Sequence, residues 1–452
     1  MRQNRERVLT IGGSDSSGGA GIQADIKTFS ALGVCGTSVI CAITAQNSTG
    51  VQDMQEVSVK LVKSQLESII GDMAVDYAKT GMLYSVLMIK TVAALLKKHY
   101  VPFVLDPVMK TGSGSVLMEQ DSLNTLVTYL LPLCQVITPN VPEASAISGL
   151  QIKTLDDAKE AAAAIHEQGA PVVIIKGGHL EREIEAGKAT DLIYNGDFKE
   201  LRGRYVNAAR VVHGAGCSFS AALAAELAKG NEVLTAATRA KEFVRDTISH
   251  GDIVSNLVVV NHAYRLREDA DRYYVLENVK EAVRMLKSTK KFERIIPEVG
   301  TNIGMAIEYA ETKNGVAAVD GRIRATMDGI RAGEVDFGVS SHVARMILAV
   351  MKRTGENRSA INVKYTPELI AACKGSGLVV SSFDRAKEPA GEATMDWGVN
   401  EALRKRGLPI DLPDVIYDLG AVGKEPMVRV FDNTAVRVVL KLRKILNVLC
   451  EE

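Results

Sequence analysis

Short runs of apolar residues alternate with amphipathic segments through the first part of the chain. The runs are continuous, as in buried strands, and they fall at Val8–Ile11, Ser38–Thr44, Tyr77–Lys79, Phe103–Leu105, Gln135–Ile137 and Val172–Ile175. The amphipathic segments between them have the spacing of helices and cover Ala20–Leu32, Val59–Ile70, Val86–Lys98, Ser122–Leu131 and Leu155–Gln168. Because helices join the strands of parallel sheets, this alternation predicts an α/β domain with helices on both faces of the sheet.

Two Ala-rich helices are predicted next, at Cys217–Ala228 and Glu232–Ser249, and then the composition changes. The segment NHAYRLREDADRYY is polar and dense in charge. It separates a part rich in glycine and alanine from a part rich in arginine. We therefore predict two domains, residues 1–266 and 267–452.

The second part also mixes the two patterns. Helices are predicted at Val279–Ser288, His342–Met351 and Gly398–Arg406. Strands are predicted at Val316–Asp320, Glu334–Val339, Leu378–Ser382, Val415–Tyr417, Met427–Val430 and Val436–Leu440. This mixture predicts a second α/β domain with a mixed sheet.

The charge balance and the cysteines narrow the class of protein. The chain has 54 basic and 54 acidic side chains, so it lacks the basic surplus that general binding to nucleic acid or to an anionic membrane requires. Its six cysteines form no CxxC pair, which argues for reduced thiols and against a zinc site. No signal peptide or membrane-spanning stretch is evident. We expect a cytoplasmic protein whose partners are small molecules.

Glycines cluster between a predicted strand and a predicted helix at Gly12–Gly21. Such a turn brings backbone N–H groups close to a ligand at the positive end of a helix. The segment fits neither the Walker A nor the dinucleotide fingerprint, so taken alone it could equally be a flexible turn.

A stronger pattern is HGAGCSFS, which opens the first Ala-rich helix. Gly214, Ala215 and Gly216 leave three backbone amides free to face an anion, such as a phosphoryl group in transfer. Cys217 follows directly and is placed to accept the proton of a substrate hydroxyl, and we expect the helix N-terminus to lower its thiol pKa. The alternative is a small buried residue.

Arginines gather beside glycines in the second part, in DGRIR and FGVSSHVAR. Arg322 and Arg324 are two positions apart, so on a strand they would present both guanidinium groups on one face, which suits a phosphate or diphosphate. His342 precedes a predicted helix, and Arg345 lies one turn further on. The alternatives are solvated surface arginines and a structural histidine.

Six motifs in the first part, taken together, resemble the hydroxymethylpyrimidine and hydroxymethylpyrimidine-phosphate kinases of thiamine synthesis. They are DSSGGAGIQADIKTFSALG, ITAQNSTGVQ, DPVM, VITPNVPEA, VIIKGGH and HGAGCSFSAALAAELAKG. The resemblance covers about residues 8–262 and implies a ribokinase-like, three-layer αβα fold. It also implies two consecutive ATP-dependent phosphorylations, of a hydroxymethyl group and then of the resulting phosphate.

The resemblance also assigns residues. It implies that the pyrimidine is held near Gly13, Asp25, Gln46 and Met82. It implies that ATP phosphates and Mg²⁺ are held by Asp106, Asn140, Glu143 and Lys176, with Asp106 and Glu143 as metal ligands. Most ribokinase-like enzymes carry an aspartate base where this chain has Cys217, but a cysteine agrees with this branch. Ala215 replaces the usual threonine of GTGC and keeps the backbone donors.

The second part resembles the archaeal-type thiamine-phosphate synthase domain, over about residues 275–445, which is known fused behind the same kinase. The matching motifs are RIIPEVGTN, AAVDGRIRA, FGVSSHVARMIL, SSFDRAKEP, TMDWG and PDVIYDLGAVGKEPMVRV. The resemblance implies coupling of hydroxymethylpyrimidine diphosphate to a thiazole phosphate, with release of pyrophosphate. Arg322, Arg324 and Arg345 are then candidates for the phosphate groups, and His342 for aiding the leaving group. The second-rank candidates are Asp384, Arg385, Glu388, Lys424 and Glu425.

We therefore predict a bifunctional transferase of thiamine biosynthesis that uses ATP and Mg²⁺. Two alternatives stay open: a pyridoxal-type kinase, and a second domain that senses thiamine phosphates without catalysis. Kinases of this family are commonly dimers, so the resemblance also implies a homo-oligomer.

Overall fold

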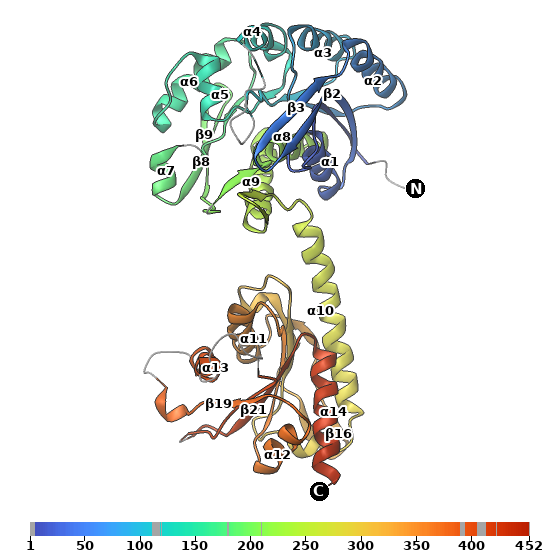
Figure 1. The fold of residues 1–452 in the computed structure, drawn as a ribbon, viewed down its shortest axis with the longest axis vertical. Coiled ribbons are helices and arrows are strands. Elements are labelled where there is room, and N and C mark those ends of the chain that lie inside the picture. The colour runs from blue at the N-terminus through green and yellow to red at the C-terminus, as the bar shows by residue number, and fades with distance from the viewer. Residues whose placement is uncertain are drawn as a thin grey trace. The chain divides into compact units, whose positions relative to one another are not determined.

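The structure is a computed structural model that describes residues 5–110, 118, 120–178, 180–208, 210–388, 394–404, 413–421 and 423–451. The chain divides into two compact units, Met1–Arg265 and Leu266–Glu452 (Figure 1). The division falls at the start of helix α10 (Tyr264–Lys287), so the polar segment NHAYRLREDADRYY lies largely within a helix. Half of its residues are strong helix formers, and Arg272 pairs with Glu268 one turn away at 3.3 Å.

The first unit is built on a nine-stranded sheet in the order β3-β2-β1-β4-β5-β6-β7-β8-β9. The six strands β2, β1, β4, β5, β6 and β7 lie side by side in that order and are all parallel. Strand β3 at one edge and strands β8 and β9 at the other pair antiparallel. The strands are β1 (Arg7–Asp15), β2 (Cys35–Asn47), β3 (Gly50–Glu56), β4 (Tyr77–Thr80), β5 (Phe103–Leu105), β6 (Val136–Ile137), β7 (Val173–Ile175), β8 (Lys188–Tyr194) and β9 (Phe198–Arg204). A small second sheet contains β10 (Val211–His213), β12 (Leu257–Val259) and β11 (Asp252–Val254).

Helices cover both faces of the large sheet. Leu9 and Ile11 face a core shared with α2 to α6, and Val8 faces a core shared with α1, α8 and α9. The helices are α1 (Gly21–Ala31), α2 (Val59–Asp72), α3 (Val86–Lys98), α4 (Gln120–Tyr129), α5 (Val141–Ser148), α6 (Leu155–Glu167), α7 (Glu181–Glu185), α8 (Ala215–Ala228) and α9 (Val233–Ser249). The predicted three-layer αβα arrangement with a mostly parallel sheet is confirmed.

The second unit has a mixed, mostly antiparallel sheet in the order β17-β14-β13-β18-β21-β20-β19, with a separate β15–β16 pair. Only β19 and β20 are parallel among these neighbours. The strands are β13 (Ile303–Ala306), β14 (Val316–Val319), β15 (Arg324–Thr326), β16 (Gly329–Arg331), β17 (Val335–Phe337), β18 (Ser359–Lys364), β19 (Val380–Ser382), β20 (Val415–Asp418) and β21 (Met427–Asp432).

Helices also cover both faces of this second sheet. Helices α10, α12 (Pro367–Gly375) and α14 (Ala435–Glu451) share one core with it. Helices α11 (Ser341–Thr354) and α13 (Thr394–Arg404) share another core on the opposite face. Short 3₁₀ turns are η1 (Leu131–Leu133), η2 (Phe292–Ile295), η3 (Lys313–Gly315) and η4 (Arg385–Lys387).

The strand predicted at Val436–Leu440 is wrong, because these residues lie inside α14. The buried positions of α14 include Val438, Val439, Leu442 and Ile445, which recur with the period of a helix. A five-residue window is too short to show that period. Of the helix predicted at Gly398–Arg406, the last two residues lie outside the described residues.

Candidate active site

A cavity of about 1290 Å³ lies where the parallel strands of the first unit end. It is lined from the ends of β1, β2 and β4 to β7 and from the start of α8. In open α/β sheets the carboxyl ends of the strands are where ligands bind. The kinase candidates from the sequence all line this cavity: Gly13, Asp25, Gln46, Met82, Asp106, Asn140, Glu143, Lys176, Gly214, Ala215, Gly216 and Cys217.

Asp15 organises the glycine-rich loop between β1 and α1. Its carboxylate accepts hydrogen bonds from the backbone and hydroxyl of Ser17, at 2.9 and 2.7 Å, and from the backbone of Ala20 at 2.8 Å. It also contacts His213 Nε2 at 2.9 Å, across 198 positions of sequence. Although burial disfavours the charged form, these bonds lower the pKa of Asp15 to about 2. The sequence pattern missed both Asp15 and the role of His213.

The same loop packs directly against the turn that opens α8. Gly214 has a φ of +93°, and a Cβ there would lie 1.9 Å from the carbonyl oxygen of Gly19. A Cβ on Gly19 would in turn lie 2.3 Å from His213 Cδ2. Both glycines are therefore required by close approach. The contact at Gly13 is softer, because a Cβ there would lie 2.6 Å from Met82 Cε, the end of a flexible side chain that can move.

The expected lowering of the Cys217 thiol pKa by the helix N-terminus is wrong for this structure. Burial raises the pKa of the thiol to about 11, although the Lys79 ammonium acts to lower it. Removal from water thus outweighs the positive surroundings, and the thiol is protonated at neutral pH.

Lys79 is a site residue that the sequence pattern did not reveal. It is completely buried at the end of β4, and its Nζ lies 2.9 Å from Asp25 Oδ2 and 3.9 Å from Asp106 Oδ2. Asp25 also accepts a hydrogen bond from Thr10 Oγ1 at 2.5 Å. A lysine in a buried strand was the available signal, since such a residue needs partners of opposite charge.

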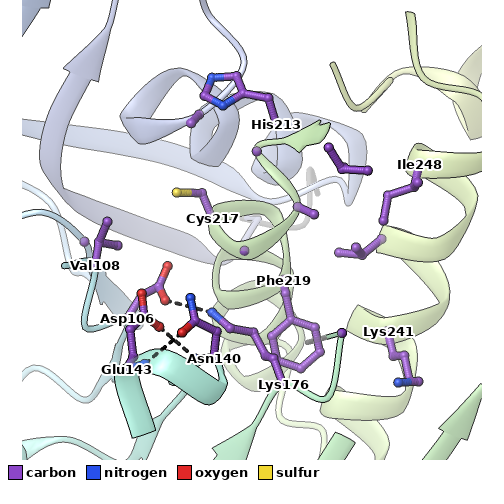
Figure 2. Close-up of a pocket in the computed structure, with 18 of the residues that line it drawn as sticks. Asp106, Val108, Asn140, Glu143, Lys176, His213, Cys217, Phe219, Lys241 and Ile248 are labelled. Carbon is purple, nitrogen blue, oxygen red and sulfur yellow. Dashed lines mark hydrogen bonds and ion pairs between the residues drawn. The ribbon is translucent and has the colours of Figure 1, made fainter. Parts of the chain in front are cut away.

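The far side of the cavity gathers the candidates for ATP and metal (Figure 2). Asn140 is the N-cap of α5 and forms a reciprocal pair of hydrogen bonds with Glu143. The backbone N–H of Asn140 donates to Glu143 Oε2 at 2.7 Å, and the backbone N–H of Glu143 donates to Asn140 Oδ1 at 2.9 Å. Lys176 Nζ lies 3.1 Å from Asp106 Oδ1. Burial raises the pKa of Glu143 to about 7, with Lys176 lowering it and Asp106 raising it.

The carboxylates of Asp106 and Glu143 suit a magnesium ion that is only partly coordinated by protein, rather than a metal site formed entirely by side chains. Among the described residues, no three His, Cys, Asp or Glu side chains gather as a metal cluster. Magnesium in kinases usually takes one or two carboxylates together with phosphate oxygens and water. A carboxylate whose pKa is raised beside another is stabilised by such a cation. Asp106 and Glu143 therefore suit Mg²⁺ that arrives with ATP.

Gln46 lies at the end of β2, beside the loop. Its backbone N–H donates to Ser16 Oγ at 2.8 Å, and its side-chain oxygen lies 3.5 Å from Thr44 Oγ1. The side-chain amide is half-buried at the cavity, where it can meet a polar ring edge.

In the second unit, the structure brings His342 together with arginines from several elements. Burial lowers the pKa of His342 to about 4, and Arg429, Arg322, Arg345 and Arg385 lower it further. Arg322 precedes β15 rather than lying on it, and it donates to the Gly300 carbonyl at 3.3 Å. The sequence pattern did not reveal Arg429, an arginine inside the apolar strand β21.

The remaining candidates of the second unit have other surroundings. Arg324 is exposed on β15, opposite Arg331 of β16. The second-rank group is divided: Arg385 pairs with Asp418, and Lys424 lies 3.5 Å from Glu388. Glu425 accepts from the backbone of Glu298 and Val299, and Asp384 is exposed.

Two family models match the chain, one over each unit. The model for phosphomethylpyrimidine kinase matches residues 15–259, and the model for thiamine-phosphate synthase ThiN matches residues 278–444. The bifunctional thiamine biosynthesis protein ThiDN of Methanocaldococcus jannaschii is 31% identical over 453 residues, which are 98% of this chain and 99% of that protein. The chain belongs to this family of bifunctional thiamine biosynthesis proteins.

Members of the family combine an ATP-dependent kinase with a thiamine-phosphate synthase, so this chain is a transferase. The hydroxymethylpyrimidine/phosphomethylpyrimidine kinase of Haemophilus influenzae is 45% identical over 249 residues, 55% of this chain and 92% of that protein. Among solved structures, the Bacillus subtilis pyridoxal kinase in its ADP complex has a TM-score of 0.53 at 39% identity, covering 58% of this chain and 99% of that one. That similarity confirms the ribokinase-like fold of the first unit. None of the described helices is long and apolar enough to cross a membrane.

Proposed function

We propose that the chain makes thiamine phosphate in three transfers, with residues 1–266 as the kinase domain and 267–452 as the synthase domain. The first domain phosphorylates 4-amino-5-hydroxymethyl-2-methylpyrimidine and then its monophosphate. The second couples the diphosphate to 4-methyl-5-(2-phosphoethyl)thiazole and releases pyrophosphate. What carries the proposal is the relative that matches both parts of the chain in one continuous alignment.

In the first transfer, the substrate hydroxyl oxygen attacks the γ-phosphorus of ATP, the bond to the β-phosphate oxygen breaks, and ADP leaves. Cys217 accepts the hydroxyl proton only in its thiolate form, which is a minority in the free protein because burial raises the pKa of the thiol to about 11. The Lys79 ammonium and a hydrogen bond from the Gly21 backbone favour that thiolate. The backbone amides of Gly214, Ala215 and Gly216 open α8 and face the charge of the transferring group.

The other kinase candidates position the two substrates. Gly13, Gln46 and Met82 line the end of the cavity that receives the pyrimidine. Asp25 lies at the same end, where its ion pair with the buried Lys79 holds its carboxylate in place. Asn140, Glu143 and Lys176 are at the end for ATP. Asp106 and Glu143 would hold Mg²⁺, which neutralises phosphate charge when bound.

In the coupling reaction, the carbon–oxygen bond to the diphosphate breaks and the thiazole nitrogen supplies the electron pair for the new carbon–nitrogen bond. Arg322, Arg345 and Arg324 bind the phosphate groups of the two substrates. His342 is neutral in the free protein at pH 7, because its pKa is lowered to about 4. A diphosphate beside it favours the imidazolium, which then donates a hydrogen bond to the leaving oxygen.

Substitutions at the two centres test this division of labour. We expect Cys217→Ala and Cys217→Ser to lower the first phosphorylation far more than they lower ATP affinity. We expect Arg322→Ala and His342→Ala to abolish coupling while kinase activity stays at the wild-type level. Near-normal phosphorylation in both Cys217 variants, or full coupling in either second-domain variant, contradicts the corresponding role.

The solved pyridoxal kinases at 36% to 39% identity favour a second candidate activity for the first domain. Pyridoxal also offers a hydroxymethyl group on a heteroaromatic ring. Measuring kcat/KM for pyridoxal and for hydroxymethylpyrimidine separates the two, and we expect the larger value for the pyrimidine.

A dimer belongs to the same proposal, since the resemblance to this kinase family implies it. The cytoplasmic location expected from the sequence is kept as part of the proposal. Light scattering of the purified chain measures its mass directly. We expect twice the mass of one chain, and the mass of a single chain contradicts the dimer.

A further inference from the structure

A row of polar side chains runs along the face of the second sheet that α11 and α13 cover. Strand residues alternate between faces, and Ala360, Ile416 and Phe431 pack with these two helices. Asn362, Asp418 and Arg429 therefore lie on this same face, since each is two positions from one of them. The register agrees, because Arg429 pairs with both Asn362 and Ile416.

Asp418 holds two arginines at the centre of this row. Its Oδ2 lies 2.8 Å from Arg429 Nη2, and its Oδ1 lies 2.8 Å from Arg385 Nε. Arg429 and Asp418 are completely buried, and the Arg385 side chain is only 8% exposed. The Arg429 guanidinium also lies 5.4 Å from the centre of the Phe383 ring, which restrains its plane.

The row continues to the residues already assigned to the diphosphate. The Asn362 side chain donates to the Gly300 carbonyl at 3.2 Å, and Arg322 donates to the same carbonyl at 3.3 Å. Val343 of α11 packs on this face, since a Cβ on Gly304 would lie 2.7 Å from its Cγ1. His342 is also in α11, and Arg429 and Arg385 of this row are among the cations that act on its imidazole.

The charges of this row do not balance. One buried carboxylate pairs with two guanidinium groups, and the other charged groups that act on His342 are Arg322 and Arg345. The Nε of Arg429 is buried and has no hydrogen-bond partner among the described residues. A buried excess of positive charge with an unused donor is costly unless an anion compensates it.

We propose that Arg385, held together with the buried Arg429 by Asp418, forms the inner end of the diphosphate site that His342 and Arg322 complete. The ligand class is a diphosphate, because several cations converge and guanidinium groups bind phosphate oxygens in pairs. This inference rests on the proposed synthase function. It gives the second-rank candidate Arg385 a binding role and adds Asp418 and Arg429 as positioning residues.

The test measures the rate of coupling when the pyrimidine diphosphate is supplied directly and ATP is left out, so the kinase domain contributes no turnover. The probe is inorganic pyrophosphate, measured as an inhibitor of coupling. We expect Arg385→Gln to raise both the KM for the diphosphate and the inhibition constant of pyrophosphate about tenfold or more, the effect of losing one charged hydrogen bond. Arg385→Lys, which keeps the charge, should recover part of that loss.

Arg284→Gln is the matched control, because Arg284 is an exposed arginine of the same unit that pairs with Glu281 within α10. It should leave both constants unchanged. Arg429→Met removes the completely buried cation and should raise the same two constants. If this variant fails to fold, the result for Arg385→Gln alone tests the inference.

An Arg385→Gln protein that folds and binds pyrophosphate as tightly as wild type overturns the inference while the synthase function stands. A wild-type protein that does not couple overturns the synthase function itself. The fold of the second unit in each variant is checked by the fluorescence of Trp397, the only tryptophan, which packs against Phe383, and retained kinase activity checks that the first unit is intact.

Discussion

At the scale of residues, buried charges govern both sites. Lys79 and Arg429 each sit in a strand among apolar neighbours, and each is completely buried beside a carboxylate. Breaking such a pair leaves an uncompensated charge in the interior, which is strongly destabilising. The cations of these pairs also act on neighbouring groups: Lys79 lowers the pKa of Cys217 and Arg429 lowers that of His342, although burial has the larger effect on each.

Replacing Lys79 tests its influence on the thiol. We expect Lys79→Met to raise the pKa of Cys217 above its value of about 11, because the ammonium favours the thiolate. A nearby opposite charge shifts a pKa by about one to three units, so alkylation of Cys217 at pH 8 should slow about tenfold or more. Mass spectrometry of the Cys217 peptide measures the rate. Lys63→Met, at a side chain 56% exposed, is the control. An unchanged rate in a folded Lys79→Met protein excludes the influence.

The depressed pKa of His342 predicts sensitivity to acid. The unfolded histidine takes up a proton near pH 6.5, whereas the folded one does so only near pH 4. Between these values the unfolded chain binds more protons, so the free energy of unfolding should fall as the pH is lowered through this window. Urea unfolding followed by Trp397 fluorescence measures it for the second unit. His342→Asn should remove part of the decrease, and parallel curves for the two proteins contradict the burial of a neutral histidine.

At the scale of elements, the kinase site depends on the close contact between the β1–α1 loop and the turn into α8. Gly214 and Gly19 make this contact, and the Asp15–His213 pair fixes it. Together they fix the position of the first turn of α8 at the cavity. A displacement of about 1 Å in such a site can cost about a hundredfold in rate.

A matched pair of alanine substitutions isolates this contact. Gly214 and Gly196 have φ values of +93° and +101°, so both pay a similar backbone penalty, but a Cβ on Gly196 meets nothing within 4 Å. We expect Gly214→Ala to lower kcat of the kinase at least about a hundredfold. Gly196→Ala should keep kcat and lose only about 1 kcal/mol of stability. Equal kinetic effects would mean that backbone strain, not the clash with Gly19, matters.

The sequence predicted what is local and missed what is paired over a distance. The strands β1, β4, β5 and β7 were predictable from continuous apolar runs, and the amides before Cys217 from adjacent glycines. The edge strand β9 was missed because most of its residues, FKELRGR, are charged and none of them is buried, so it has no apolar run or apolar alternation. Lys79 and Asp25 are 54 positions apart, so only the folded structure shows them as a pair. The helix α14 was misread because a short window hides its period.

At the scale of the whole molecule, each unit has its own sheet, its own cores and its own site. The described structure shows no residue that the two sites share. The product of the kinase domain is the substrate of the synthase domain. Because both domains are on one chain, the two sites are always present at equal concentration.

Mixing two single-site variants tests whether the sites work independently. Cys217→Ala protein should still couple supplied diphosphate, and His342→Ala protein should still make the diphosphate. We expect a mixture of the two to form thiamine phosphate from hydroxymethylpyrimidine, because the intermediate can diffuse between molecules. A mixture that accumulates the diphosphate but forms no product shows that the two sites must lie on one chain.

The most direct measurement supplies the purified protein with hydroxymethylpyrimidine, ATP, Mg²⁺ and the thiazole phosphate, and follows the products by chromatography. We expect ADP, pyrophosphate and thiamine phosphate, with the pyrimidine diphosphate as a transient intermediate. Accumulation of the diphosphate without thiamine phosphate would contradict the synthase role of the second unit and favour a domain that senses thiamine phosphates.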